Sequence, residues 1–477
     1  MTEHLQTPAH ALIDSLDADT IGDWVEHQRW YASKSRHVTG LDFDECVRLA
    51  DGPPLVLALV QARFASGSHE LYQLLLTFLP PGAKPDATPD ATPDAKAPGV
   101  IASTLSATVV DSLADPELAR DLLRRIDAGS QFDGEEGSFR FERVQSAERV
   151  SPDAPARPIG VEQSNSSIVF GDQTVLKVFR KLEPGINPEL ELLQFLTRRQ
   201  FPHIAPLQGW YEYEGRSFSA TLGVAQRFFP DARGGWELAL EQIASDPAAF
   251  LIELGQLGRV TAELHNALAS DANDPDFSPE APSVESLALL TATIDEDIER
   301  IFVRLPDDER VASIAGRGQD VRERIAMRSQ VGVGGRTIRT HGDFHLGQTL
   351  HTPRGWVIID FEGEPARPLF ERRQKRSPLR DVASMLRSFA YAASAVSILH
   401  GGYAPAQFEP RARESFLEQY FAHIEPALLP PSEAGIVNLL SIFELEKAIY
   451  ELQYELDNRP DWLPIPVAGI ARLLESE

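Results

Sequence analysis

The stretch of sequence that decides the fold is His341–Asp360, which reads HGDFHLGQTLHTPRGWVIID. In it, Asp343 is followed five positions later by Gln348, and a short apolar strand over Trp356–Ile359 leads to Asp360. A carboxylate such as Asp343 can orient an acceptor hydroxyl as a general base. The side-chain oxygens of Gln348 and Asp360 suit Mg²⁺, which prefers oxygen ligands. The stretch therefore predicts a site at which a phosphoryl group passes from ATP to a hydroxyl.

Two other interpretations of this stretch stay open. The first is a histidine-rich surface loop followed by an ordinary strand. The second is a zinc site formed by His341, His345 and Asp360. Gly342 and Gly347 disfavour the helix on which two histidines four residues apart usually bind zinc.

Two more parts that a kinase needs lie upstream in the required order. The β-rich runs Ser167–Phe170 and Thr174–Phe179 are joined by Gly171-Asp172, which is a strong hairpin signal. Lys177 lies in the second run, and we expect it to contact the ATP phosphates. Four polar residues upstream of this lysine are expected to hold phosphate oxygens: Gln163, Ser164, Ser166 and Ser167. The alternative is that they form an ordinary polar turn.

The pair Asn187-Pro188 predicts the start of a helix, with the asparagine as N-cap and the proline at the first helical position. A carboxylate of this helix should form an ion pair with Lys177. Glu191 is favoured for this pair, because Glu189 suits the positive end of the helix dipole. Further along, the segment Gln226–Pro230 is expected to join two lobes and to meet adenine with its backbone.

A segment near the C-terminus, Ser441–Leu456, has the pattern of an amphipathic helix. One stripe is apolar and consists of Ile442, Leu445, Ile449, Leu452 and Leu456. The opposite face carries Lys447, Tyr450, Glu451 and Tyr454 at helical spacing. Aromatic rings beside charged groups suit a sugar, while a solvated face with incidental tyrosines is the alternative. Closer to Asp360 lies a basic run that consists of Arg367, Arg372, Arg373, Lys375, Arg376, Arg380 and Arg387. We expect it to pair mainly with Glu362, Glu364, Glu371 and Asp381. One or two of its cations are expected to contact phosphate or sugar instead.

The composition limits what the protein binds. The chain of 477 residues has 45 Lys and Arg against 71 Asp and Glu, which gives a net charge of −26. Such an acidic surface disfavours nucleic acid. The single cysteine, Cys46, fits a reducing compartment. No signal peptide and no run of 18 apolar residues is evident, so we expect a cytoplasmic protein with no membrane contact, and a monomer is favoured.

The repeat over residues 84–99, KPDATPDATPDAKAPG, contains no large apolar side chain and should form an extended, mobile loop. The chain is expected to have three parts. Residues 1–98 would form a cap, residues 99–225 a β-rich small lobe that binds ATP, and residues 226–477 a helical large lobe with the catalytic loop and sugar site. The predicted fold class is α+β, with a bilobal fold like that of eukaryotic protein kinases and an N-terminal α+β cap.

The chain resembles the actinobacterial maltokinases and their close relatives, which include bacterial glucosamine kinases. The resemblance rests on GVEQSNSSIVFGDQTVLKVFRKLEPGINPELE, HGDFHLGQTL, VIIDFEGEPARPL, SPLRDVASMLRSF, EKAIYELQYE and the N-terminal QRWYASKSR. Aminoglycoside phosphotransferases share the fold and the core of the catalytic loop, but not these flanking motifs. The resemblance implies a kinase fold with a cap, and ATP and Mg²⁺ as cofactors. It also implies Asp343 as catalytic base, Gln348 and Asp360 as Mg²⁺ ligands, Lys177 as an ATP contact, and a sugar site at His341, Asp343, Lys447, Tyr450, Glu451 and Tyr454.

The chain departs from the maltokinase pattern at Ala390, at Lys375-Arg376 and at Leu452-Gln453. These departures favour glucosamine, giving glucosamine 6-phosphate, over maltose, giving maltose 1-phosphate. An ammonium group would also suit Glu451 or Glu455 by charge pairing. The other hypotheses are an aminoglycoside phosphotransferase and a catalytically inactive nucleotide-binding module.

Overall fold

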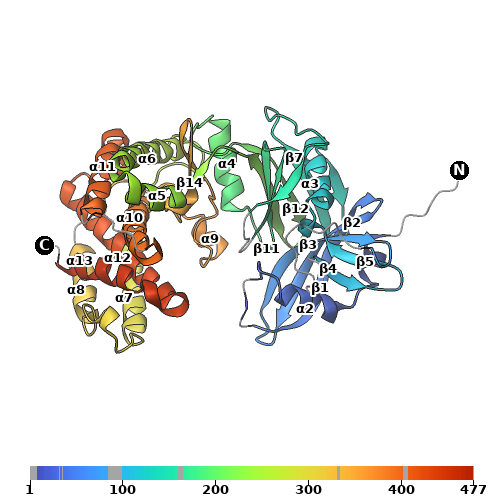
Figure 1. Cartoon of the computed structure of the whole chain (residues 1–477), viewed down its shortest axis with the longest axis horizontal. Coiled ribbons are helices and arrows are strands. Elements are labelled where there is room, and N and C mark those ends of the chain that lie inside the picture. The colour runs from blue at the N-terminus through green and yellow to red at the C-terminus, as the bar shows by residue number, and fades with distance from the viewer. Residues whose placement is uncertain are drawn as a thin grey trace. The chain divides into compact units, whose positions relative to one another are not determined.

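The computed structural model of the protein describes residues 8–31, 33, 34, 36–83, 99–159, 165–329, 334–400, 405 and 407–475. The expected Pro-Asp-Ala-Thr loop lies outside the described residues except for Gly99. The chain forms two compact units, whose elements are labelled in Figure 1. Unit 1 comprises Met1–Gln194 and Ala205–Pro230, and unit 2 comprises Phe195–Ile204 and Asp231–Glu477. The boundary after Pro230 coincides with the end of the segment that was expected to join two lobes.

Unit 1 contains a first sheet with the order β1-β2-β3-β5-β4, to which β11 adds by pairing with β3. Its strands are β1 (Val38–Asp51), β2 (Pro54–Phe64), β3 (His69–Leu79), β4 (Val100–Ser103), β5 (Thr108–Asp111) and β11 (Lys181–Leu182). Helices α1 (Ala9–Ile13) and α2 (Ala18–Glu26) contribute Ile13, Ile21 and Val25 to the apolar core of this sheet. The sheet takes strands from both sides of residue 98, and the predicted three-part division of the chain stays a prediction.

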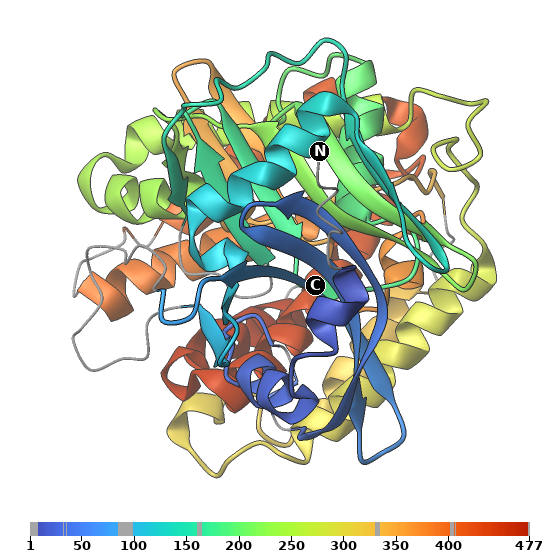
Figure 2. The ribbon, with the colours of Figure 1, turned by 90° about the vertical axis from the view of Figure 1, so that its right-hand side faces the viewer.

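A second sheet of unit 1 has the order β6-β7-β12-β13-β10-β9-β8. Its strands are β6 (Gln131–Asp133), β7 (Gly137–Arg143), β8 (Ala156–Pro158), β9 (Asn165–Phe170), β10 (Thr174–Phe179), β12 (Leu207–Gly215) and β13 (Ser219–Arg227). Helix α3 (Pro116–Ala128) packs against β7 and is the cyan helix of Figure 2. The predicted hairpin is confirmed as β9 and β10, and both Gly171 and Asp172 adopt positive φ in its turn.

The two sheets of unit 1 are joined through one continuous segment. β10 ends at Phe179, and after Arg180 the chain continues as β11 in the first sheet. Gln73, which is fully buried in β3, donates from Nε2 to the carbonyl oxygens of Phe179 and Leu222. Arg180 forms a bidentate pair with Asp111 of β5. Buried polar groups need such partners, so these bonds fix the first sheet to the strand that carries Lys177.

Helix α4 (Pro188–Arg198) begins as predicted, because the side chain of Asn187 accepts a hydrogen bond from the N–H of Glu189 at 2.8 Å. Its first residues belong to unit 1 and its last four to unit 2. The helix presents Glu189 and Glu191 in its first turn.

Unit 2 is mainly helical. Its helices are α5 (Gly235–Ser245), α6 (Pro247–Leu268), α7 (Val284–Phe302), α8 (Gly318–Ser329), α9 (Leu369–Arg372), α10 (Leu379–His400), α11 (Phe408–His423), α12 (Glu433–Asn458) and α13 (Pro464–Glu475). A small sheet has the order β14 (Arg233–Gly234), β15 (Thr349–Thr352) and β16 (Gly355–Ile358). The loop that begins at His341 leads into β15, and Asp360 follows β16. The β15–β16 hairpin therefore brings the two ends of His341–Asp360 close together.

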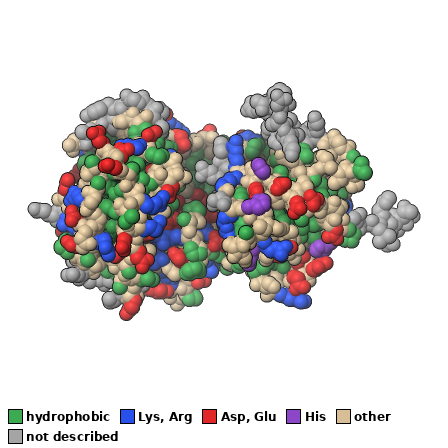
Figure 3. All heavy atoms as spheres, turned by 90° about the horizontal axis from the view of Figure 1, so that it is seen from below, with side chains coloured by type: hydrophobic (Ala, Val, Ile, Leu, Met, Phe, Trp, Pro, Cys, Tyr) green, Lys and Arg blue, Asp and Glu red, His purple; other side chains and the backbone are tan. Residues whose placement is uncertain are grey.

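The predicted apolar stripe of α12 is confirmed. Ile442, Leu445, Ile449 and Leu452 belong to the core shared by α7, α8, α12 and α13, and Leu456 packs against that core. None of the helices in the described part of the chain combines the length and the apolar content that a membrane span requires. Acidic and basic side chains are interspersed on the face shown in Figure 3.

Candidate functional site

Lys177 of β10 lies in a network of buried polar groups in unit 1. Its Nζ contacts Oε2 of Glu189 at 2.7 Å, and Oε1 of the same carboxylate accepts from Nε2 of Gln226 at 2.8 Å. The sequence analysis favoured Glu191 as the partner, so this preference is corrected in favour of Glu189. The reason is local: the Asn187 side chain caps the helix, which leaves the Glu189 carboxylate able to turn toward the sheet.

The predicted phosphate-holding residues divide into three cases. Gln163 and Ser164 lie outside the described residues. Ser167 pairs directly with Lys177 across β9 and β10, so both side chains lie on the same face of the sheet. Ser166 lies on the opposite face, where it is buried and its Oγ accepts a hydrogen bond from Nε of Arg180 at 2.7 Å. The structure therefore gives Ser166 a partner in the interior of unit 1 in place of a ligand.

In unit 2, the loop that begins at His341 is held by Asp381 of α10. The two carboxylate oxygens of Asp381 accept from the backbone N–H groups of His341 and Gly342, at 2.8 and 3.0 Å. Asp381 is fully buried, which opposes ionisation, but contacts with His265 and these N–H groups hold its pKa below the ordinary value. His265 in turn contacts the hydroxyl of Tyr420 at 3.0 Å. Asp381 was expected only to pair with arginine, and no sequence motif marks His265 or Tyr420.

The ring of His341 is used within the loop. Its Nε2 contacts the carbonyl oxygen of Ile359 at 2.9 Å, and its Nδ1 accepts from the N–H of Asp343 at 3.4 Å. Only 1 % of the residue is exposed. This corrects the expectation that His341 contacts a sugar. It also removes support for the zinc alternative, because the Nε2 of His341 donates a proton to a carbonyl and has no lone pair to offer.

Asp343 is placed between two potential cations. Its Oδ1 lies 3.1 Å from Nζ of Lys447 on α12, and its Oδ2 lies 3.9 Å from Nε2 of His345. Burial opposes ionisation of Asp343, but the ammonium group of Lys447 holds the pKa of the carboxyl below its ordinary value. Burial also lowers the pKa of His345, which favours its neutral form. Asp343 is thus an ionised carboxylate that can accept a proton or orient a hydroxyl.

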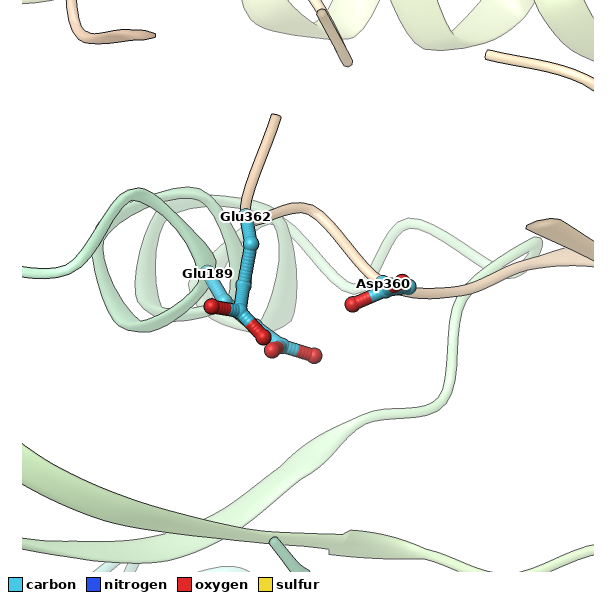
Figure 4. A group of neighbouring side chains, drawn as sticks. All are labelled: Glu189, Asp360 and Glu362. Carbon is cyan, nitrogen blue, oxygen red and sulfur yellow. The ribbon is translucent and has the colours of Figure 1, made fainter. Parts of the chain in front are cut away.

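Gln348 and Asp360, the predicted Mg²⁺ ligands, are in contact. Nε2 of Gln348 donates to Oδ2 of Asp360 at 2.8 Å, and Asp360 has a positive φ of 64°. A carboxylate oxygen of Glu362 lies within 4.8 Å of one of Asp360. Figure 4 shows Asp360 and Glu362 on the loop that follows β16, and Glu189 on the first turn of α4. An amide beside carboxylates is an oxygen-rich donor set that fits Mg²⁺. Sequence reasoning did not identify Glu362 as a possible ligand.

The four α12 residues predicted to face a sugar do not share one surface. Tyr450 and Tyr454 are 40 % and 44 % exposed, and Lys447 lies 4.9 Å from the centroid of the Tyr450 ring. Glu451 instead is buried and accepts from Nε and Nη2 of Arg387 on α10, at 3.0 and 2.6 Å. The expectation for Glu451 is therefore corrected: the packing of α10 against α12 directs its carboxylate into the interior.

A pocket with a cavity volume of about 120 Å³ in unit 2 is adjacent to Gly342 and Lys447, the chain neighbour and the ion-pair partner of Asp343. Gly342 of the catalytic loop, Lys447 and Tyr450 of α12 and residues of α7 line it. Its three carboxylates are each in an ion pair: Asp297 with Arg300, Glu364 with Arg367, and Glu446 with Arg367 and Arg380. Sequence reasoning missed the contribution of α7, which has no motif of its own.

One member of the basic run, Arg367, pairs with two of the nearby carboxylates, as expected. Arg367 contacts Glu364 and Glu371. The other pairs were not predicted, because their partners lie far along the chain: Lys375 pairs with Glu280, and Arg380 pairs with Glu446.

Comparison with known families matches most of the chain. Residues 24–115 match the maltokinase N-terminal cap domain, and residues 155–423 match the phosphotransferase enzyme family. Two similar proteins are both named glucosamine kinase. The one from Mycolicibacterium smegmatis (strain ATCC 700084 / mc(2)155) is 28% identical over 337 residues, which cover 67% of this chain and 79% of that protein. The one from Streptacidiphilus jiangxiensis is 25% identical over 342 residues, which cover 68% and 75%.

Solved structures show the same fold. A glucosamine kinase in complex with glucosamine, ADP and inorganic phosphate has a TM-score of 0.67 and 20% identity, and the match covers 95% of this chain and 99% of that chain. A second glucosamine kinase structure, crystal form B, has a TM-score of 0.69 and 19% identity, with 96% and 99% covered. These matches confirm the predicted α+β, protein-kinase-like fold with an N-terminal cap, and the expected resemblance to maltokinase-like and glucosamine kinase sequences.

Proposed function

Because this chain belongs to the phosphotransferase enzyme family, we propose that it transfers the γ-phosphate of ATP to a hydroxyl of a small sugar. Glucosamine is the favoured acceptor, which would give glucosamine 6-phosphate. Maltose, which would give maltose 1-phosphate, is the alternative.

The observation that carries this proposal is the placement of Asp343. Its carboxyl group, whose pKa is held below the ordinary value, contacts Lys447 through one oxygen, and Lys447 and Gly342 line a pocket between α7 and α12. An acceptor hydroxyl that donates to the other oxygen, Oδ2, would be oriented for attack on a phosphoryl group, and Asp343 would take up its proton. The neutral His345 leaves this oxygen without a strong competing cation.

The cofactor roles follow from the donor sets of each unit. Gln348 and Asp360, with Glu362 as a further candidate, would hold Mg²⁺. When bound, the metal ion neutralises charge on the phosphates. Lys177 would contact an ATP phosphate, because its ammonium group lies on the same sheet face as Ser167 and is kept in place by Glu189. Tyr450 would offer its half-exposed ring to a sugar, and Tyr454 would do so in the same way.

Support for glucosamine comes from the two relatives of that name and not from local charge. Glu451 is paired with Arg387, and Glu455 is paired with Arg459 at 2.7 Å. The three pocket carboxylates are also paired with arginine. Among the described residues of this pocket, no carboxylate is therefore left to bind the ammonium group of a substrate. Charge pairing with Glu451 or Glu455 therefore does not favour glucosamine over maltose.

The test is a coupled ADP-release assay with Mg²⁺ and ATP, run in parallel on glucosamine, glucose, maltose and kanamycin. Turnover on glucosamine well above that on the other sugars is expected. Turnover on maltose alone would establish the alternative acceptor, and turnover mainly on kanamycin would establish an aminoglycoside phosphotransferase. An absence of turnover with every acceptor would support an inactive nucleotide-binding module and overturn the proposal.

A further inference from the structure

A buried amide at the end of β13 donates a hydrogen bond to the Glu189 carboxylate. Gln226 is 6 % exposed, and its Nε2 donates to Oε1 of Glu189 at 2.8 Å. The other oxygen of the same carboxylate faces the ammonium group of Lys177 at 2.7 Å. Glu189 itself is only 1 % exposed. A buried carboxylate needs donors for its oxygens, and a donor to an ionised acceptor forms a strong hydrogen bond.

The register of the second sheet explains why these groups meet. Val175 of β10 pairs with Gln226 of β13, and Lys177 pairs with Val224. Directly paired residues of antiparallel strands point to the same face, as do residues two apart on one strand. Gln226 and Lys177 therefore project to one face of the sheet from neighbouring strands, and Glu189 of α4 lies against that face between them.

We propose that Gln226 is a positioning residue of the nucleotide site: its amide fixes the Glu189 carboxylate, and Glu189 in turn fixes the ammonium group of Lys177. This inference rests on the proposed function, in which Lys177 contacts ATP. Without the amide, Oε1 of Glu189 is left buried with one donor fewer, which disfavours the present orientation of the carboxylate. A Glu189 carboxylate that turns away no longer holds Lys177. The side chain of Gln226 thus acts on ATP through two other residues.

The test replaces Gln226 by methionine, which has a similar length and volume but no donor. For Gln226→Met we expect kcat/KM for ATP to fall by about tenfold or more, with the KM for the sugar unchanged. A purely structural role would not separate the dependence on ATP from the dependence on the sugar in this way.

Gln208→Met is the matched control. Gln208 accepts a hydrogen bond from Oγ1 of Thr174 at 2.7 Å in the same sheet and has no recorded bond to Glu189. This variant should lower the melting temperature without changing the dependence on ATP. If Gln226→Met does not fold, Gln226→Asn keeps the polarity of the site, and its shorter amide does not reach the carboxylate.

A double variant separates positioning from packing. If Gln226 acts through Lys177, then adding Gln226→Met to Lys177→Met should not weaken ADP binding further, as measured by calorimetry. A further loss equal to that of Gln226→Met alone would overturn the inference, as would ATP parameters of Gln226→Met that equal those of Gln208→Met. A wild-type protein without turnover on any acceptor would overturn the proposed function instead, and the ADP affinities would still test the role of Gln226.

Discussion

At Asp343, burial and a neighbouring cation act in opposite directions on one carboxyl group. Burial favours the neutral acid, whereas the ammonium group of Lys447 favours the carboxylate, and the net effect lowers the pKa. Partial burial alone would lower the pKa of Lys447, but its pairing with Asp343 and Glu364 raises this pKa above the ordinary value. The pair is thus charged on both sides at neutral pH.

Replacing Asp343 by asparagine tests its proposed role as base. Asp343→Asn should lower turnover by roughly 10²-fold or more, the scale of general-base loss, while ADP still binds. Turnover is measured by ADP release and binding by calorimetry. Asp457→Asn, which removes only an exposed pair with Arg304, is the control and should keep normal turnover. A near-normal rate for Asp343→Asn would exclude the assignment.

Replacing Lys447 by methionine tests the electrostatic coupling. Activity that needs the ionised Asp343 is lost as the pH falls through the pKa of that group. Because Lys447 lowers this pKa, Lys447→Met should raise it, and the acid limb of kcat should move to higher pH. The measurement is a pH–rate profile, with Lys375→Met, which removes a pair with Glu280, as control. An unchanged limb would show that Lys447 does not set the ionisation of Asp343.

The residues of the site that follow one another in sequence were predictable, because motif spacing fixes them. Asp343, Gln348 and Asp360 all come from one stretch, and the structure brings Gln348 and Asp360 into contact. The partners of that stretch were less predictable. The hydrogen bonds from the loop to Asp381 and the burial of His341 depend on how α10 packs against the loop. No local sequence pattern predicts that packing.

At the scale of elements, the β9–β10 hairpin and helix α12 illustrate both outcomes. The turn at Gly171-Asp172 and the apolar stripe of α12 were predictable from local chemistry and periodicity. The side-chain directions on the polar side of α12 were not. Glu451 turns inward to Arg387, because a helix with neighbours on two sides has little truly free surface.

The hairpin turn can be tested at Gly171. An alanine there would adopt an unfavourable positive φ of 59°, and its Cβ would approach Cβ of Ala154 to 2.8 Å. Gly171→Ala should therefore lower the free energy of unfolding by about 2–4 kcal/mol, as the sum of backbone strain and overpacking. Urea denaturation measures the change.

Gly67→Ala is the control for that experiment. Gly67 also has a positive φ, of 79°, but a Cβ there would meet nothing within 4 Å. This variant should show the backbone strain alone, about 1–2 kcal/mol. Equal losses for Gly67→Ala and Gly171→Ala would show that the contact with Ala154 adds nothing.

At the scale of the whole molecule, the net charge of −26 dominates the electrostatics. Most of the ion pairs seen on the surface are exposed and contribute little each. Repulsion among the excess carboxylates should therefore outweigh them, and salt screens that repulsion. We expect the melting temperature to rise when NaCl is increased from about 10 mM to about 200 mM. Choline chloride at equal ionic strength should give the same rise, and a fall would show that attractive pairs prevail.

The strand that carries Lys177 also has a consequence for how this chain can be cut and recombined. β10 continues through Arg180 into β11, which pairs with β3. Gln73 of β3 donates hydrogen bonds to the carbonyl oxygens of Phe179 and Leu222. A shortened protein that begins at Gly99 would lose β3 and expose the edges of both β5 and β11. Open strand edges recruit other chains, so such a fragment should aggregate. Residues 1–98 therefore cannot be exchanged alone for the corresponding segment of a related protein. A chimera that folds would have to take β1–β5 and Lys181–Leu182 from the same parent protein.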